Sequence, residues 1–221
     1  MAELAKNTNG GLTTVKKCIF QTMEYGMIIE GDTADSTGEK KAKQYLINEK
    51  YQYFLFFMID NDNLIVKTYN FNLKCVNHYS VNFKLKKFYE IICSNIDRMK
   101  EKYDIGTICL SLPCVVNGGI VLDWYYNSNL NRFNLKSALI NKYHLNTIIQ
   151  NDMQLTVIGE SAEIRRNTKN IITVQFGHNG IGVGEMANGR LLEGNSGFAG
   201  EVGYINNLRK NIMEFLTPLK L

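Results

Sequence analysis

The residues best suited to chemistry lie in a glycine-rich stretch at residues 177–204, GHNGIGVGEMANGRLLEGNSGFAGEVGY, which carries the carboxylate of Glu201 near its end. An apolar run at residues 170–176 precedes it and predicts a strand that leads into the glycines. Glycines in such a turn permit unusual backbone angles and let another group approach the main chain closely. A phosphate or a sugar could bind there, and ordinary hairpin turns, including one at Asn188-Gly189, explain the same glycines equally well.

The order of several motifs is more specific than any one of them. SLPCVVNGG at 111–119 is followed by Asn-Asp at 151–152, Gly-Glu at 159–160, and then the glycine-rich stretch GIGVG, NGRLLEG and GFAGEVG. In this order and spacing the chain resembles the ROK family of sugar kinases and sugar-responsive repressors, over nearly its whole length. It is most similar to the repressor branch, of the xylose-repressor or N-acetylglucosamine-repressor type, in a form shortened at both ends.

The resemblance assigns sugar contacts to Asn151, Asp152 and Glu201. Asp152 matches the acid that is the general base towards the sugar hydroxyl in the kinases, and a carboxylate can equally accept a hydrogen bond from a sugar that is never phosphorylated. Asn151 would add a donor and an acceptor. Asn151-Asp152 is also explained as the N-cap of a helix ahead of Met153, and both roles can hold together.

Residues 60–64 predict the loss of kinase chemistry. Family kinases bind ATP phosphates with Asp-x-Gly-Gly-Thr, where bare backbone N–H groups and a hydroxyl hold the anion. The matching residues are Asp-Asn-Asp-Asn-Leu, so both glycines and the hydroxyl are replaced. We therefore expect no phosphoryl transfer, no catalytic residue and no cofactor, and a tight Asn/Asp turn explains this stretch well.

No metal site is expected. Where the family commonly has His after Glu-x-Gly and then a cysteine-rich loop, this chain has Tyr204, and no cysteine follows Cys114. Without a thiolate or imidazole cluster there is no tetrahedral zinc site. His178, beside the glycine turn, is the histidine most worth examining, and a structural role is the simpler explanation for it.

Composition excludes several classes of protein. The chain has 221 residues, 45% hydrophobic content, a formal charge of +4 and five cysteines without a Cys-x-x-Cys pair. No run is long enough to span a membrane, and the N-terminus lacks the apolar core of a signal peptide. The scattered cysteines fit a reducing compartment, so we expect a cytoplasmic protein.

Residues 1–50 predict a winged helix-turn-helix. Helices are expected at 2–7 and 13–25, and strands at 27–29 and 44–47 around a polar loop. The module resembles the N-terminal part of ROK repressors, whose pattern begins with one more helix that here would precede Met1. Its seven lysines are balanced by seven acids, so DNA contact depends on local placement. The expected DNA-contacting residues are Thr13, Thr14, Lys16 and Lys17 on the recognition helix and Lys40, Lys41 and Lys43 in the wing.

From residue 51 the pattern predicts an α/β (α+β) domain. Strands are expected at 54–59, 64–69, 75–81 and 105–112, with a helix at 85–100 before the last of them. A helix at 135–143, a strand at 146–149, a helix at 153–164 and the glycine-rich hairpin follow. This order is similar to the opening of the actin-like, ribonuclease-H-like fold of ROK proteins. Residues 51–221 would form the sugar-sensor domain, with its second lobe incomplete.

The sequence is compatible with three functions. The first is a sugar-responsive DNA-binding regulator without kinase activity, whose partners are operator DNA, a sugar effector and a second subunit in a homodimer. The second is an ATP-dependent hexose kinase. The third is a shortened sensor remnant that neither binds operator DNA nor closes on a sugar.

Overall fold

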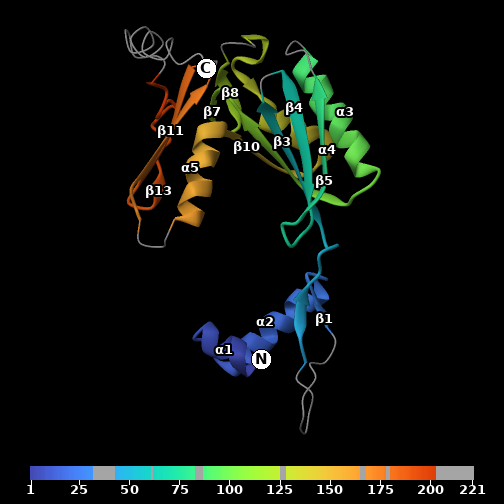
Figure 1. The fold of residues 1–221 in the computed structure, drawn as a ribbon. Helices are drawn as coiled ribbons and strands as arrows, with labels where there is room; N and C mark the ends of the chain where they lie inside the picture. The colour runs from blue at the N-terminus through green and yellow to red at the C-terminus, as the bar shows by residue number, and fades with distance from the viewer. Residues whose placement is uncertain are drawn as a thin grey trace, which may run out of the picture.

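The computed structural model describes residues 1–31, 43–60, 62–82, 87–124, 128–164, 168–177 and 180–202, which form a mixed α/β structure (Figure 1). Its helices are α1 (Ala2–Asn7), α2 (Leu12–Glu24), α3 (Phe88–Lys100), α4 (Leu135–Tyr143) and α5 (Asp152–Glu163), with a 3-10 helix η2 (Ser128–Leu130). Its strands are β1 (Ile28–Glu30), β2 (Tyr45–Ile47), β3 (Tyr53–Asp60), β4 (Asn63–Tyr69), β5 (Cys75–Asn82), β6 (Ile105–Leu112), β7 (Val115–Asn117), β8 (Ile120–Asp123), β9 (Phe133–Asn134), β10 (Asn146–Asn151), β11 (Ile171–Gly177), β12 (Gly180–Ala187) and β13 (Arg190–Leu191).

The N-terminal elements occur in the predicted order. α1 has the expected bounds, and α2 begins at Leu12, one residue earlier than expected. Gly26 ends α2 with a φ of 75°, and the N–H groups of Gly26 and Met27 donate to the carbonyls of Met23 and Thr22, which is a Schellman motif. β1 and β2 then pair antiparallel. Figure 1 shows these elements apart from the larger part of the chain.

The central sheet has five strands in the order β10-β6-β3-β4-β5. β3, β4 and β5 form the predicted meander, and β6 and β10 add to β3 as parallel strands. β6 has the predicted bounds, whereas β10 runs two residues further, to Asn151. The hairpin between β3 and β4 closes on the pair Asp60 and Asn63, as the Asn/Asp turn predicted.

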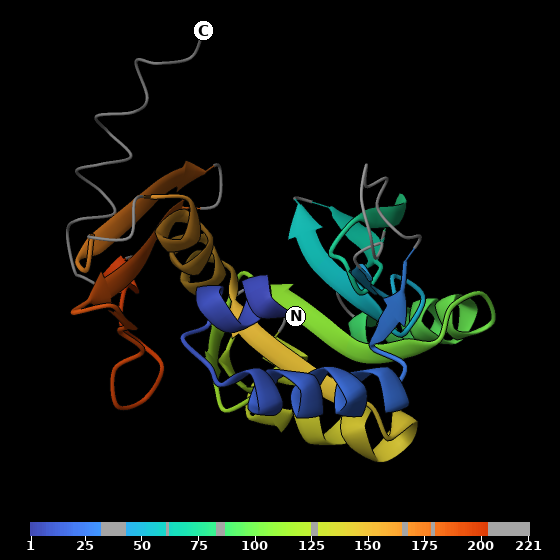
Figure 2. The same ribbon diagram turned by 90° about the horizontal axis from the view of Figure 1, so that it is seen from below.

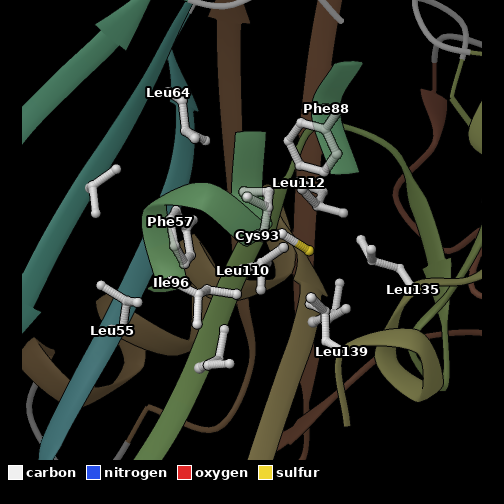
Figure 3. Close-up of a cluster of buried hydrophobic side chains, with 14 of the residues drawn as sticks. Leu55, Phe57, Leu64, Phe88, Cys93, Ile96, Leu110, Leu112, Leu135 and Leu139 are labelled. Atoms are coloured by element: carbon white, nitrogen blue, oxygen red, sulfur yellow. The ribbon is translucent and has the colours of Figure 1, made fainter. Parts of the chain in front are cut away.

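One face of this sheet is buried beneath α3 and α4 (Figure 3). Because side chains alternate along a strand, Leu55 and Phe57 of β3 point to this face together with Leu110 of β6. α3 contributes a helical stripe that includes Phe88 and Ile96, and α4 contributes Leu135 and Leu139. Full burial of each such side chain stabilises the fold by roughly 1.5–3 kcal/mol.

Three short strands between β6 and α4 were not predicted. No strand was expected between the end of β6 at Leu112 and residue 135, but β7 begins at Val115 and β8 at Ile120. β7, β8 and β9 form a small antiparallel sheet. Gly118 and Gly119 have φ angles of 60° and 85°, and these positive values let the two residues turn β7 into β8.

The apolar run at residues 170–176 and the glycine-rich stretch after it form a further three-stranded sheet, β11-β12-β13, and α5 packs against it. Asn188 and Gly189 both have positive φ and connect β12 to β13, which confirms the predicted Asn-Gly hairpin. Figures 1 and 2 both place this sheet and α5 on the opposite side of the larger part from β5 and α3.

Candidate functional site

Three parallel strands end together at the edge of the sheet that carries the predicted sugar residues. β3 and β10 both run parallel to β6, and Asn151 at the end of β10 lies opposite Leu112 at the end of β6. In open α/β sheets, ligands bind beyond the carboxyl ends of the strands. The fold therefore brings Asn151 and Asp152 to the edge where a ligand is expected.

Asn151 caps helix α5. Its Oδ1 accepts hydrogen bonds from the backbone N–H groups of Met153 at 2.9 Å and Gln154 at 3.1 Å. Its Nδ2 donates to the carbonyl oxygen of Cys114 at 3.1 Å, which ties the helix start to the segment after β6. The N-cap interpretation is confirmed, and Asn151 is buried with most of its amide already bonded within the chain. A direct sugar contact from Asn151 stays a prediction.

Asp152 is the first residue of α5 and lies largely buried at the sheet edge. Its Oδ1 accepts a hydrogen bond from the Met153 N–H at 2.8 Å. Burial raises the pKa of Asp152 from 3.8 to about 6, and the backbone hydrogen bonds lower it only in part. At neutral pH the carboxylate is ionised and can only accept hydrogen bonds. Burial makes this charged form unfavourable, and a ligand hydroxyl that donates to it would stabilise it.

The glycines of β12 allow α5 to start this close to the second sheet. A Cβ on Gly182 would lie 2.6 Å from Met153 Cγ, and a Cβ on Gly184 would overlap the Met153 carbonyl oxygen. Met153 directly follows Asp152, so the space left by these two glycines fixes where the carboxylate lies. The Gly-Ile-Gly-Val-Gly pattern thus serves close packing of a helix on a strand.

Glu201 approaches the same place from the loop after β13. Gly197 of this loop lies against β7, where a Cβ would be 2.7 Å from the Val116 carbonyl oxygen, and Gly200 lies against the Val183 carbonyl of β12. The pKa of Glu201 is raised, first by burial and then by the negative charges of Asp152 and Asp123. The structure therefore brings the two predicted carboxylates, Asp152 and Glu201, within electrostatic reach of each other.

Asp123, at the end of β8, joins this pair and was missed in the sequence. It pairs with Val115 across β7 and β8, which brings it beside Cys114 and the start of β7. Its Oδ1 accepts a hydrogen bond from Asn131 Nδ2 at 3.1 Å. The pKa of the buried Cys114 thiol is raised well above its usual range by burial and by the charges of Asp152, Glu201 and Asp123, so the thiol stays protonated.

One signal in the sequence could have revealed Asp123. Asn117, Gly118 and Gly119 between two short apolar runs indicate a hairpin turn, which would place residues after the turn back beside Cys114. Nothing in the sequence pattern indicated a hydrogen bond between Gln150 and Glu193. Gln150 Nε2 donates to Glu193 Oε1 at 3.0 Å, and this bond links β10 to the loop that carries Glu201.

The hairpin between β3 and β4 lies at the same carboxyl edge, because β3 is parallel to β6 and β10. Asp60 and Asn63 close the hairpin, and Asp62 is exposed in its turn, whereas Asn61 lies outside the described residues. Leu64, which the resemblance matched to the kinase threonine, is fully buried in the core. The loss of kinase chemistry at residues 60–64 stays a prediction.

The metal prediction rests on residues that the structure does not describe. Tyr204 and His178 both lie outside the described residues. Among the residues that are described, no group of three His, Cys, Asp or Glu side chains is arranged to hold a metal ion. Absence of zinc stays a prediction for the whole chain.

The predicted DNA-contacting residues of α2 form an exposed cluster at its start. Thr13, Thr14, Lys16 and Lys17 are all exposed on the first turns. Neither threonine caps the helix, because the N-cap residue of α2 is Gly11. α2 begins one residue earlier than expected, so both exposed threonines lie within its first turn.

The predicted wing residues are only partly described. Lys40 and Lys41 lie outside the described residues. Lys43 Nζ forms an ion pair with Glu30 Oε1 at 2.9 Å across β1 and β2. Both side chains are largely exposed, so a phosphate could compete for Lys43 only by replacing this partner.

The fold and the order of its motifs agree with comparisons to known proteins. The ROK family profile matches residues 64–212, which is more than half of the chain. The chain belongs to the ROK family. The resemblance stated from the motifs is thereby confirmed, and the ROK-type α/β fold with it. None of the helices described for this chain is both long and apolar enough to cross a membrane.

Its relatives include regulators and kinases. The xylose repressor of Staphylococcus xylosus is 26% identical over 212 residues, 91% of this chain and 55% of the repressor. The glucokinase of Halalkalibacterium halodurans is 34% identical over 112 residues, 48% of this chain and 32% of the kinase. A crystal structure of a ROK family transcriptional regulator, a homolog of the E. coli MLC protein, superposes with a TM-score of 0.72 at 21% identity, over 92% of this chain and 54% of that one. The chain spans about half the length of the curated repressors it matches.

Proposed function

We propose that this ROK chain is a sugar-responsive, DNA-binding transcriptional regulator of carbohydrate-metabolism genes, of the repressor type and without kinase activity. The observation that carries the proposal is that one sheet edge has the carboxylates of a sugar site but lacks the glycines of a phosphate loop. Asp152 and Glu201 converge there as a sugar site would require, while the β3–β4 hairpin lacks glycines and places Leu64 in the core. A site that binds a sugar and cannot hold ATP phosphates fits an effector pocket better than an active site.

Coverage of the relatives supports the same choice. The xylose repressors match over nine-tenths of this chain, whereas the glucokinase matches about half of it. Residues 1–50 would be the winged helix-turn-helix, with α2 as the recognition helix. Residues 51–221 would be the sugar sensor, and the protein would act in the cytoplasm, where its operator lies.

In this proposal the sugar hydroxyls donate to the ionised carboxylates of Asp152 and Glu201. These side chains come from two sides, since Asp152 belongs to α5 and Glu201 to the loop after β13. A sugar that binds both would draw the loop and the sheet edge together. Such a sugar shifts DNA affinity only if it binds one arrangement of the chain better than the other.

A mobility-shift experiment tests the proposal. The folded chain is titrated with a duplex from upstream of its own gene, alone and with D-xylose, D-glucose or N-acetylglucosamine. We expect one sugar to change DNA affinity about fivefold or more, the usual lower range of such coupling. Glu201→Gln should retain DNA binding and lose the response. A duplex bound equally with and without every sugar would contradict a sugar-responsive regulator, and no binding at low salt would favour the remnant.

The hexose kinase is the second candidate, because the glucokinase relative reaches 34% identity. Asp152 stands where such an enzyme needs its general base. We expect no sugar-dependent ADP release above that of a no-sugar control, since the hairpin at residues 60–64 has no bare glycine amides for the phosphates. Release that appears with a sugar and disappears in Asp152→Asn would establish the kinase instead.

A further inference from the structure

The loop that carries Glu201 closes on itself. We call residues 192–201, which follow β13, the Glu201 loop. The N–H of Ala199 donates to the carbonyl oxygen of Glu193 at 3.3 Å, so the two ends of the loop lie side by side. Gly194 allows this closure, because it has a φ of 69° and a Cβ there would lie 3.3 Å from the Ala199 nitrogen. A contact that holds Glu193 in place therefore also holds the end of the loop.

The side chain of Glu193 ties the Glu201 loop to β10. Its Oε1 accepts a hydrogen bond from Gln150 Nε2 at 3.0 Å. Gln150 lies in the last turn of chain before Asp152, at the end of β10. Hydrogen bonds to a carboxylate are stronger than those between neutral groups. This bond thus joins the two halves of the proposed sugar site, one with Asp152 and the other with Glu201.

Gln150 extends the connection into α5. The same Nε2 also donates to Oε1 of Gln154, a side chain that is buried. The backbone N–H of Gln154 donates in turn to Asn151 Oδ1 at 3.1 Å, in the cap of α5. Because buried polar groups need partners, this row of hydrogen bonds is a fixed part of the helix start. The row therefore runs from Glu193 to the helix whose first residue is Asp152.

Two glycines of the Glu201 loop make contacts of a different kind. Gly197 lies against the Val116 carbonyl of β7, and Gly200 lies against the Val183 carbonyl of β12. These are close steric contacts, which limit how near the loop can come to its neighbours. The hydrogen bond to β10 acts the other way, because it draws the loop towards the strand end.

We propose that Glu193 and Gln150 are positioning residues of the sugar site, whose hydrogen bond holds Glu201 where it can share one ligand with Asp152. The inference rests on the proposed function, since it gives this bond a role in sugar binding. Neither residue needs to touch the sugar. The bond orders the loop before the sugar arrives, so less conformational entropy is lost on binding.

Two substitutions at one position test the role of the bond. Glu193→Ala removes the acceptor, whereas Glu193→Gln removes the charge and keeps an oxygen for Gln150. Hydrogen exchange of the peptide over residues 192–202 is measured without sugar, and calorimetry measures affinity for whichever of the three test sugars binds. In Glu193→Ala the peptide should exchange at least about threefold faster and sugar affinity should fall about fivefold, because the loop opens more often. Glu193→Gln should stay within about twofold of the wild-type chain in both measurements.

Two further variants separate the bond from the fold. Asn195→Ala changes an exposed residue of the same loop and should leave both measurements unchanged. Gln150→Glu places two acids opposite each other and should weaken sugar binding at least as much as Glu193→Ala. Adding Glu193→Gln to Gln150→Glu restores the bond with donor and acceptor exchanged, so affinity should recover. General damage to the fold would not be reversed in this way.

The remaining outcomes distinguish this inference from the proposed function. Equal exchange rates in the wild-type chain and Glu193→Ala would overturn the positioning role. A sugar that binds both chains with equal affinity would also overturn it and would leave the proposed function standing. Faster exchange in Glu193→Ala, in a chain that binds no sugar at all, would support the hold of the bond on the loop and overturn the proposed function.

Discussion

At the scale of single residues, the carboxylate of Asp152 determines how the site responds to pH. Burial raises its pKa to about 6, and the negative charges of Asp123 and Glu201 lie nearby. If the sugar binds the ionised form, its affinity follows the ionised fraction, which is about nine-tenths at pH 7 and about one-tenth at pH 5. Affinity should therefore fall about tenfold between these values. Calorimetric titration with whichever of the three test sugars binds measures this, and a flat profile would exclude the ionised carboxylate as the acceptor.

The same group predicts a change in stability. The pKa of Asp152 is higher in the folded chain than the ordinary 3.8, so the folded state binds the proton more tightly between about pH 4 and 6. Stability is therefore lost as pH rises through this window, and the loss is complete above it. Two pKa units correspond to at most about 3 kcal/mol.

Replacement of Asp152 by Asn removes this cost and keeps an oxygen for the Met153 N–H. The free energy of unfolding in urea should rise by about 1–3 kcal/mol at pH 7 and change little at pH 4. Glu163→Gln removes an exposed carboxylate at the far end of the same helix and serves as the matched control. An equal gain at both pH values would rule out ionisation as the cause.

At the scale of elements, the contact between β12 and α5 depends on Gly184. An added Cβ would overlap the Met153 carbonyl oxygen, and both partners are backbone that cannot rotate away. Gly184→Ala should lower the free energy of unfolding by about 1–3 kcal/mol or more and weaken sugar binding, because α5 carries Asp152. Gly159 lies in α5 with open space around it, so Gly159→Ala should be neutral or stabilising by up to about 1 kcal/mol. A neutral Gly184→Ala would mean that α5 moves freely on the sheet.

The elements also show what the sequence could predict. Long strands and helices with clear periodicity, such as β6 and α4, have the predicted bounds because their buried stripes are long enough to read. β7, β8 and β9 were missed because runs of two to four residues carry no measurable period. Asp123 was missed with them, since its place beside Asp152 depends on strand pairing over distant residues. Asn151, Asp152 and Glu201 were predicted from the family motifs, and their roles towards a sugar stay predictions.

At the scale of the whole molecule, the N-terminal elements differ from the rest in their burial. In the described part of residues 1–50 the buried apolar side chain is Ile19, while Phe20, Tyr25 and Leu46 are exposed. The larger part instead has a contiguous core over the central sheet. The proposed DNA-binding module therefore depends on few internal contacts, and its affinity for DNA decides between a regulator and a remnant.

Binding to DNA should divide the α2 residues into two classes. Lys16 and Lys17 are exposed, and in this proposal they contact DNA phosphates and not base edges. Their replacement by Ala should therefore weaken binding to any duplex and reduce the salt slope by roughly two. Thr13 and Thr14 face solvent on the first turn of α2 and would fix its register by hydrogen bonds, so their replacement should reduce specific binding more than non-specific binding.

The measurement is a set of mobility shifts at two salt concentrations, on the upstream region of the gene and on an unrelated duplex. If the chain forms a dimer, affinity should be greatest for a pseudo-palindrome with half-sites one or more helical turns apart, roughly 10 bp per turn. Lys136→Ala, in the larger part of the chain on α4, removes one positive charge outside the module and should leave the specific complex unchanged. A salt slope that the double lysine variant does not alter would remove α2 as the DNA-contacting helix, because lost phosphate contacts must release fewer counterions.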